Sequence, residues 1–365
     1  MICASCGEDN PDDAKWCEAC GHDLLSVLSP PCVACGEREV GPDGYCLSCG
    51  HKQPAERDHQ EYREGTVVAV SDRGRRHRQN EDAVAIATTA GGVAVLVVCD
   101  GVSTTAGSAR ASLRAAAAAR DLLVAGIDAA DEAGADVTAD LPELLTRAVA
   151  AAQVEASASV DDQELVSTSV LATTGPAPTD HGGPPSSTFV AVVATPDDGD
   201  VELATAWVGD SRAYWLGEDM RRLTPVDHEL QGSLIRWLGA DSVDPTPDIE
   251  TVRMSGPGRL VVCSDGLWRY AAEPRELDEV VRRLMEDGRT GLDLASGLVD
   301  FANDAGGHDN ITVALWSNSP DWAPGAGDGD GDDEADEAGN EAAAVVGDEA
   351  DEAGDENEET ADDGG

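Results

Sequence analysis

Short runs of apolar residues, most of them β-branched, recur through the middle of the chain and end abruptly at polar positions. A run of this kind is typical of a strand that is buried on both faces. Three of the runs stand beside an aspartate: 95–99 before Asp100, 260–263 before Asp265, and 311–316 after Asp309. Carboxylates delivered to strand ends from distant parts of a chain indicate one shared, oxygen-rich site for hard divalent cations.

The same patterning predicts the remaining elements. Strands are expected at 66–71, 83–88, 93–99, 188–195, 201–208, 212–216, 249–254, 259–263 and 311–316. Stretches with helical spacing, the first two rich in alanine, predict helices at 107–126, 141–159, 274–286 and 291–303. Many strands joined mostly by short connections, with helices in two groups, indicate an α+β fold in which helices cover sheets.

Eight cysteines near the beginning of the chain form two copies of one pattern: Cys3, Cys6, Cys17, Cys20 and then Cys32, Cys35, Cys46, Cys49. Paired thiolates on two tight turns give the four-sulfur set that zinc prefers. Disulfides and redox dithiols are the alternatives, and the duplicated spacing in an intracellular chain favours zinc. We expect two structural zinc ribbons, at 1–24 and 30–52, which depend on their metal for folding and precede a linker at 53–61.

The chain is strongly acidic, with 72 acidic against 24 basic side chains and a formal net charge of −48. This balance disfavours nucleic acid and anionic membranes as partners, because phosphate binding needs basic patches. A surface adapted to high salt and a simply acidic protein both fit the charge. Residues 323–365 contain 18 acidic residues and no lysine or arginine, so we expect a disordered tail there. No apolar run approaches the ~20 residues of a membrane helix, and we expect a cytoplasmic protein.

Seven short motifs follow one another between residues 80 and 312. They are Asn80-Glu81-Asp82, Asp100-Gly101, Ser187-Thr188, Val208-Gly209-Asp210-Ser211-Arg212, Leu223-Thr224-Pro225-Val226-Asp227-His228, Ser264-Asp265-Gly266-Leu267-Trp268 and Asp309-Asn310-Ile311-Thr312. Each motif alone is weak, since Asp-Gly is mostly a turn. In this order, with matching strand and helix context, they resemble the metal-dependent (type 2C) serine/threonine protein phosphatases over residues 62–317.

The resemblance implies a four-layer αββα sandwich, in which two antiparallel sheets flanked by helices hold metals in the cleft between them. It implies that Asp100 bridges two manganese or magnesium ions, with the Gly101 carbonyl on the first ion and Asp265 and Asp309 on the second. Glu81 would act through metal-bound water. Two such cations lower the pKa of a bridging water, so that hydroxide can attack phosphorus near neutral pH. Asp100, Glu81, Asp265 and Asp309 are the catalytic groups of this implied mechanism.

The resemblance also implies a third, weaker metal at Asp210. The alternative for Asp210 is a turn residue that bonds to its own backbone. Four residues after Asp265, where an aspartate often supports the third metal, this chain has Arg269. A strong third-metal site is therefore not expected.

Two further departures concern the substrate. Where family members commonly have an arginine that binds phosphate, this chain has His77, so Arg76 or Arg78 is expected to take that role. Many members have histidine after the Asp-Gly pair, and here Val102 follows it. The proton for the leaving group must then come from solvent or from another side chain.

The leading hypothesis is a phosphatase that removes phosphate from serine and threonine side chains of proteins, which would be substrates of a serine/threonine kinase. Its zinc ribbons would serve docking or regulation. A second hypothesis is a catalytically weak, phosphatase-like module that signals through its ribbons, but Asp100, Asp265 and Asp309 favour the enzyme. A third, a zinc-ribbon nucleic-acid factor, conflicts with the acidic charge.

Overall fold

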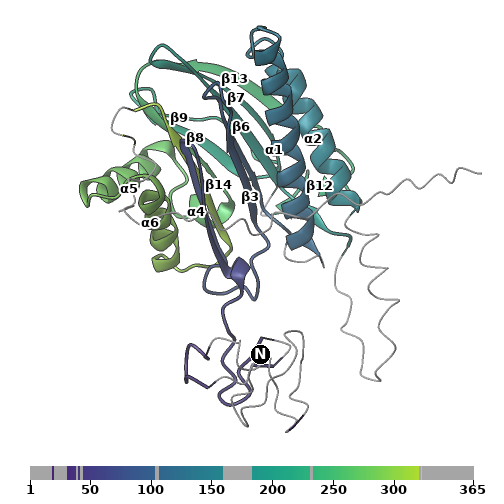
Figure 1. The fold of residues 1–365 in the computed structure, drawn as a ribbon, viewed down its shortest axis with the longest axis vertical. Helices are drawn as coiled ribbons and strands as arrows, with labels where there is room; N and C mark the ends of the chain where they lie inside the picture. Colours follow the sequence, from purple (N-terminus) through teal and green to yellow (C-terminus); the bar gives the residue numbers. More distant parts are fainter. Residues whose placement is uncertain are drawn as a thin grey trace, which may run out of the picture. The chain divides into compact units, whose positions relative to one another are not determined.

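Two antiparallel sheets form the centre of the computed structural model (Figure 1). The structure describes residue 19 and residues 31–37, 40–41, 44–102, 107–158, 183–230, 233–319 and 322. The tail expected to be disordered, 323–365, lies outside the described residues, as do Cys3, Cys6, Cys17 and Cys20.

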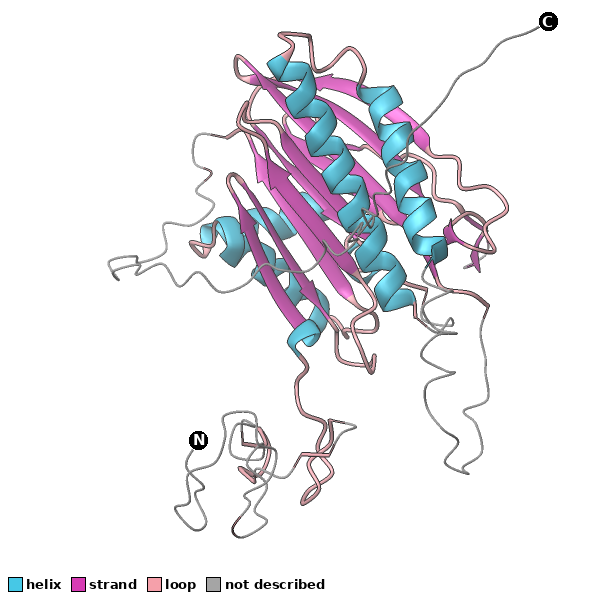
Figure 2. Cartoon of the chain, turned by 45° about the vertical axis from the view of Figure 1, so that its right-hand side comes forward, coloured by secondary structure: helices cyan, strands magenta, loops and turns pink. Residues whose placement is uncertain are grey.

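The first sheet has five strands in the order β13-β7-β6-β4-β3. They are β3 (Ala83–Thr88), β4 (Ala94–Cys99), β6 (Phe189–Asp197), β7 (Asp200–Val208) and β13 (Asp248–Met254). Helices α1 (Ser108–Glu132) and α2 (Leu141–Ala158) lie side by side over one face of this sheet (Figure 2). Their buried side chains are largely alanines, and such small residues allow helices to pack closely on a sheet.

The second sheet has six strands in the order β1-β2-β15-β14-β8-β9. They are β1 (His59–Glu64), β2 (Val67–Asp72), β8 (Arg212–Gly217), β9 (Arg221–Arg222), β14 (Gly258–Cys263) and β15 (Ile311–Ser317). Helices α4 (Asp265–Trp268), α5 (Pro274–Glu286) and α6 (Gly291–Asp304) pack on it through their apolar side chains.

The two sheets face each other across a shared apolar core. Leu96 and Val192 from the five-stranded sheet and Trp215, Val262 and Trp316 from the six-stranded sheet belong to one buried cluster. Because both faces of these strands are covered, β4 and residues 260–263 of β14 are apolar without alternation with polar residues. The predicted α+β fold with two antiparallel sheets and covering helices is thus confirmed.

Short elements complete the described fold. They are the 3-10 helix η1 (Glu56–Asp58), the strand pair β5 (Ser186–Ser187) and β12 (Leu238–Gly239), and the strand pair β10 (Glu229–Leu230) and β11 (Ser233–Leu234). In the part of the chain that the structure describes, no helix combines the length and apolarity needed to cross a membrane.

Two boundaries differ from those expected from the sequence. Helix α1 does not end at Gly126 but continues to Glu132. Gly126 is a packing residue and not a helix terminator, because a Cβ there would lie 2.4 Å from Cδ1 of Leu144 in α2. The segment expected as a linker, 53–61, contains η1 and the first residues of β1. Strand β1 is largely exposed at the sheet edge, so its sequence lacks an apolar run.

Candidate active site

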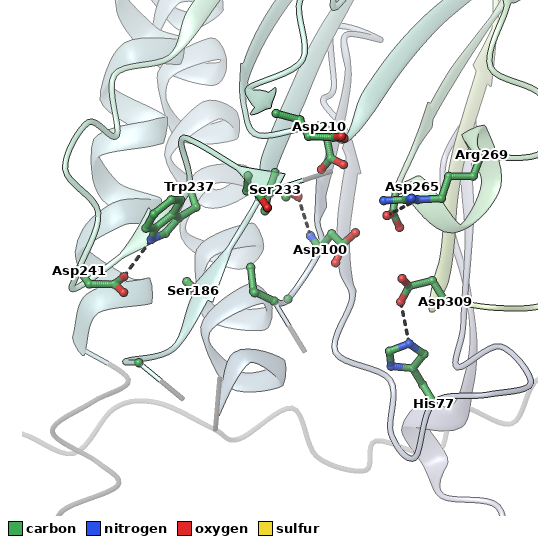
Figure 3. A pocket seen from close by; sticks show the side chains of 16 residues that line it. His77, Asp100, Ser186, Asp210, Ser233, Trp237, Asp241, Asp265, Arg269 and Asp309 are labelled. Carbon is green, nitrogen blue, oxygen red and sulfur yellow. Dashed lines mark hydrogen bonds and ion pairs between the residues drawn. The ribbon is translucent and has the colours of Figure 1, made fainter. Parts of the chain in front are cut away.

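One cavity of about 500 Å³ collects most of the predicted acidic residues (Figure 3). Asp100 follows β4, Asp210 follows β7, Asp265 follows β14 and Asp309 precedes β15. All four line the cavity together with Gly101. The structure therefore brings to one place aspartates that are up to 209 positions apart in the sequence.

Thr188 links Asp100 to the segment that carries Asp210. The backbone N–H of Asp100 donates to Oγ1 of Thr188 at 3.0 Å, and the N–H of Thr188 donates to the Asp100 carbonyl at 2.8 Å. The same Oγ1 lies 2.7 Å from Oγ of Ser211. Gly209 is required here, because its φ is +110° and a Cβ would lie 2.7 Å from Cβ of Thr188.

Asn310 ties Asp309 to the segment that precedes β3. Its Nδ2 donates to the carbonyls of Arg73 at 2.8 Å and Gln79 at 3.1 Å, and its Oδ1 accepts from the N–H of Glu81 at 2.8 Å. Since Asn310 is buried and satisfied on both sides, the backbone beside Asp309 has little freedom to move.

Asp265 stands at the first position of the short helix α4, where it is held by Arg269. Nε of Arg269 donates to Oδ2 of Asp265 at 2.7 Å, across one helical turn. The other oxygen, Oδ1, is buried and has no hydrogen-bond partner among the described residues. Asp265 therefore has one oxygen fixed and one left for a ligand.

The acidic side chains raise one another's pKa values. Burial, followed by the charges of Asp82 and Asp265, raises the pKa of Asp100 well above its usual range. Burial and the charge of Asp265 raise the pKa of Asp210 to about 7, and Arg269 opposes that rise. Burial and then Asp309 raise the pKa of Asp265. Without a counter-charge this arrangement resists full ionisation.

Asp82 is an acidic residue of this neighbourhood to which sequence reasoning gave no role. It is almost fully buried, and neither carboxylate oxygen accepts a hydrogen bond of good geometry from the described residues. Burial and the charges of Asp265 and Asp309 raise its pKa to about 7. Its place in the Asn-Glu-Asp motif, directly after Glu81, is the feature that could have drawn attention to it.

These residues fit a site for hard divalent cations. The described cavity wall offers several buried carboxylates one guanidinium, that of Arg269, and oxygens of Asp82 and Asp265 have no hydrogen-bond partners among the described residues. Oxygens of Asp100, Asp265 and Asp309 do not all come within 4.8 Å of one another.

The remaining predicted residues lie around this centre. Glu81 is buried and accepts from Nε2 of Gln79 at 3.1 Å, but it is not among the residues that line the cavity. His77 does line the cavity, whereas Arg76 and Arg78 on either side are exposed and do not. The expectation that one of these arginines binds phosphate stays a prediction.

The second cysteine set converges on one point. Sγ of Cys32 lies 3.7 Å from Sγ of Cys49, Sγ of Cys35 lies 3.6 Å from Sγ of Cys46, and all four sulfurs lie within 4.8 Å of one another. A tetrahedral zinc site with Zn–S bonds of about 2.3 Å places its sulfurs about 3.8 Å apart. The structure thus supports one four-cysteine zinc cluster; the first set lies outside the described residues.

Comparison with known proteins gives the class of this chain. The protein phosphatase 2C family profile matches residues 73–300, a span that includes Asp100, Asp210 and Asp265. The chain belongs to the protein phosphatase 2C family of serine/threonine phosphatases, which confirms the predicted enzyme class.

Particular relatives agree with this assignment. The serine/threonine phosphatase stp of Listeria monocytogenes is 26% identical over 264 residues, which cover 67% of this chain and 92% of the relative. The corresponding protein of Listeria innocua is 32% identical over 133 residues, covering 31% of this chain and 51% of that protein. The crystal structure of Stp1 from Staphylococcus aureus shares the fold, with a TM-score of 0.50 and 21% identity over 69% of this chain and 94% of Stp1.

Proposed function

We propose that this phosphatase hydrolyses phosphoserine and phosphothreonine in proteins with the help of two manganese or magnesium ions. Asp100, the Gly101 carbonyl, Asp265 and Asp309 would hold the ions. The observation that carries the proposal is the single cavity lined by these residues, in which several buried carboxylates with raised pKa values share one guanidinium, that of Arg269. Divalent cations, when bound there, neutralise phosphate charge and lower the pKa of water.

The side chains around the ligands keep this site in one arrangement. Arg269 holds one oxygen of Asp265 by a hydrogen bond. The Asp265 side chain is therefore already ordered, and little conformational entropy is lost when its other oxygen binds an ion. Glu81, whose N–H donates to Oδ1 of Asn310 and whose carboxylate accepts from Gln79, would act through metal-bound water. Asp210 would contribute to a third and weaker site, limited by the neighbouring charge of Arg269.

The leaving serine or threonine oxygen must be protonated as the ester bond breaks. Val102 lines the cavity after Gly101 and has no acidic proton. The proton would then come from solvent water in the cavity or from another side chain that lines it.

The rest of the cavity lining is suited to a polypeptide substrate. It includes Glu229, Ser233 and Leu234 of the β10–β11 pair, together with Trp237 and Asp241. Mixed polar and apolar groups of this kind can contact the residues that flank a phosphorylated side chain. Phosphorylated proteins made by a serine/threonine kinase are accordingly the proposed substrates.

The four-cysteine cluster would hold one structural zinc ion, and the repeated spacing gives the first set, Cys3 to Cys20, a second one. Two ribbons at 1–24 and 30–52 would then precede a catalytic unit at 62–317. All four protein ligands of the described cluster are cysteines, which is typical of closed structural sites. Docking or regulation is therefore the role we propose for the ribbons.

The decisive experiment measures phosphate release from phosphoserine and phosphothreonine peptides by the full chain. Turnover should require added manganese or magnesium and should stop with EDTA. Absence of turnover at any metal concentration would instead support the second candidate, a phosphatase-like module that acts through its zinc ribbons.

A further inference from the structure

Arg269 places a guanidinium group in the wall of the catalytic cavity. Its Nε donates to Oδ2 of Asp265 at 2.7 Å, and its Cζ lies 5.4 Å from the centroid of the Trp268 ring. About half of the side chain is exposed, and Arg269 lines the same cavity as Asp100 and Asp309. In Figure 3 the side chain reaches from α4 toward Asp265 and the other carboxylates.

The two contacts restrain the guanidinium group but do not occupy its Nη donors. The ion pair occupies only Nε, and among the described residues the Nη nitrogens of Arg269 have no hydrogen-bond partner. An arginine held in this way keeps N–H donors in a fixed fork that matches two oxygens of a phosphate. Little side-chain entropy remains to be lost when such a group binds.

No other arginine and no lysine competes for this role in the described cavity wall. Arg269 is its one guanidinium-bearing residue, since Arg76 and Arg78 lie outside it and His77 is paired with Asp309. In the sequence, the undescribed residues next to the lining positions Val102, Gly183 and Ser233, which are 103–106, 159–182 and 231–232, contain no arginine or lysine.

We propose that Arg269 binds the phosphate group of the substrate and of the product orthophosphate, taking the role that the sequence suggested for Arg76 or Arg78. The inference deepens the proposed phosphatase function and rests on it. Through Nε the residue orients Asp265, and through its Nη atoms it donates charge-assisted hydrogen bonds to phosphate oxygens. One residue thereby couples the position of a metal ligand to the position of the substrate.

Orthophosphate is the probe, and the protein is the full chain saturated with manganese. Arg269→Gln should raise the inhibition constant of orthophosphate and the KM for a phosphoserine peptide by about tenfold, the loss expected for a charge-assisted hydrogen bond. The stabilisation of the manganese-loaded protein by orthophosphate in thermal unfolding should fall in parallel. Arg269→Lys, which keeps the charge without the fork, should give an intermediate effect.

Arg282→Gln is the matched control. Nε of Arg282 also lies 2.7 Å from a buried aspartate one helical turn away, Asp278, and the side chain is similarly exposed, but it lies outside the catalytic cavity. This variant should change the orthophosphate constants by less than about twofold. Calorimetric titration with manganese shows whether each variant still binds metal.

The outcomes separate this inference from the proposed function. If Arg269→Gln binds manganese and leaves the orthophosphate constants unchanged, while Arg76→Gln or Arg78→Gln raises them, the inference is wrong. If the wild-type chain releases no phosphate from peptides, the proposed function fails. The thermal measurement then still decides whether orthophosphate binding depends on Arg269.

Discussion

Nε2 of His77 lies 3.1 Å from Oδ1 of Asp309. His77 occupies the position at which the family resemblance suggests an arginine. Its side chain is shorter than that of arginine and contacts Asp309, a proposed metal ligand. The imidazole therefore supports Asp309 from the cavity wall, and the proposed phosphate-binding cation is Arg269 instead. His77 thus stands where an arginine is expected, and Arg269 is the arginine that we propose binds phosphate in its place.

A double variant tests this relationship. His77→Arg introduces a fork-shaped donor beside Asp309, so His77→Arg combined with Arg269→Gln should recover about tenfold in orthophosphate affinity relative to Arg269→Gln alone. His77→Gln combined with Arg269→Gln carries no new cation and should recover nothing. Equal behaviour of the two double variants, measured as orthophosphate inhibition, would show that position 77 does not reach phosphate.

Asp100→Asn should lower kcat by at least about a thousandfold, because a neutral amide cannot bridge two cations. The fold should survive, since burial raises the pKa of Asp100 and the neutral form is already favoured without metal. Initial rates on a phosphoserine peptide, circular dichroism and manganese titration together check both parts. Turnover within tenfold of the wild-type rate would exclude the bridging role.

The metal-free protein should become more stable on mild acidification. Burial and like charges raise the pKa values of Asp82 and Asp210 to about 7 in the folded state, against about 3.9 for an unfolded chain. The folded state then binds protons more tightly, so this contribution is present at low pH and is lost as the pH rises through about 7. We expect the Tm of EDTA-treated protein to rise between about pH 8 and about pH 6.

Asp82→Asn supplies the control for this pH dependence. The variant cannot titrate at position 82, so its Tm should change less with pH than that of the wild type. Manganese should reverse the trend in the wild type, because cations compete with protons for the carboxylates. Identical slopes for wild type and Asp82→Asn without metal would contradict the assigned titration.

The sequence allowed the aspartates proposed to bind metal to be placed at strand ends, because apolar runs that stop at a carboxylate depend only on local order. The sequence could not reveal which side-chain hydrogen bonds connect these strand ends to one another. Asn310 bonds to Arg73, Gln79 and Glu81 across more than 200 positions, and such side-chain contacts leave no periodicity in the sequence. Likewise, the contact of Arg269 with Asp265 becomes visible only once α4 is known to begin at Asp265.

Elemental analysis of the full chain should find about two zinc ions per molecule, one for each four-cysteine set. Cys35→Ser should leave one, because three thiolates bind zinc far less tightly than four and the described cluster would be lost. Cys263→Ser is a suitable control: Cys263 is a buried cysteine of β14 and is not one of the four cluster residues. Two zinc ions retained in Cys35→Ser would refute the ligand assignment.

Gly266→Ala should disrupt the junction between α4 and β15. A Cβ at Gly266 would lie 1.9 Å from the carbonyl oxygen of Asn310 and 2.8 Å from its carbonyl carbon. The Asn310 side chain is anchored by the carbonyls of Arg73 and Gln79, so this backbone cannot retreat without breaking those bonds. We expect a loss of about 2 kcal/mol or more in the free energy of unfolding, measured with urea.

The same substitution should weaken manganese binding, because Gly266 follows Asp265 and Asn310 follows Asp309, so the methyl group drives two proposed ligands apart. Gly91→Ala is the matched control: the nearest atom to its Cβ lies at 3.9 Å, an ordinary contact, and we expect little change in urea stability or manganese affinity. If Gly266→Ala unfolds at the wild-type urea concentration and binds manganese equally well, the close approach of α4 to Asn310 does not hold the ligands together.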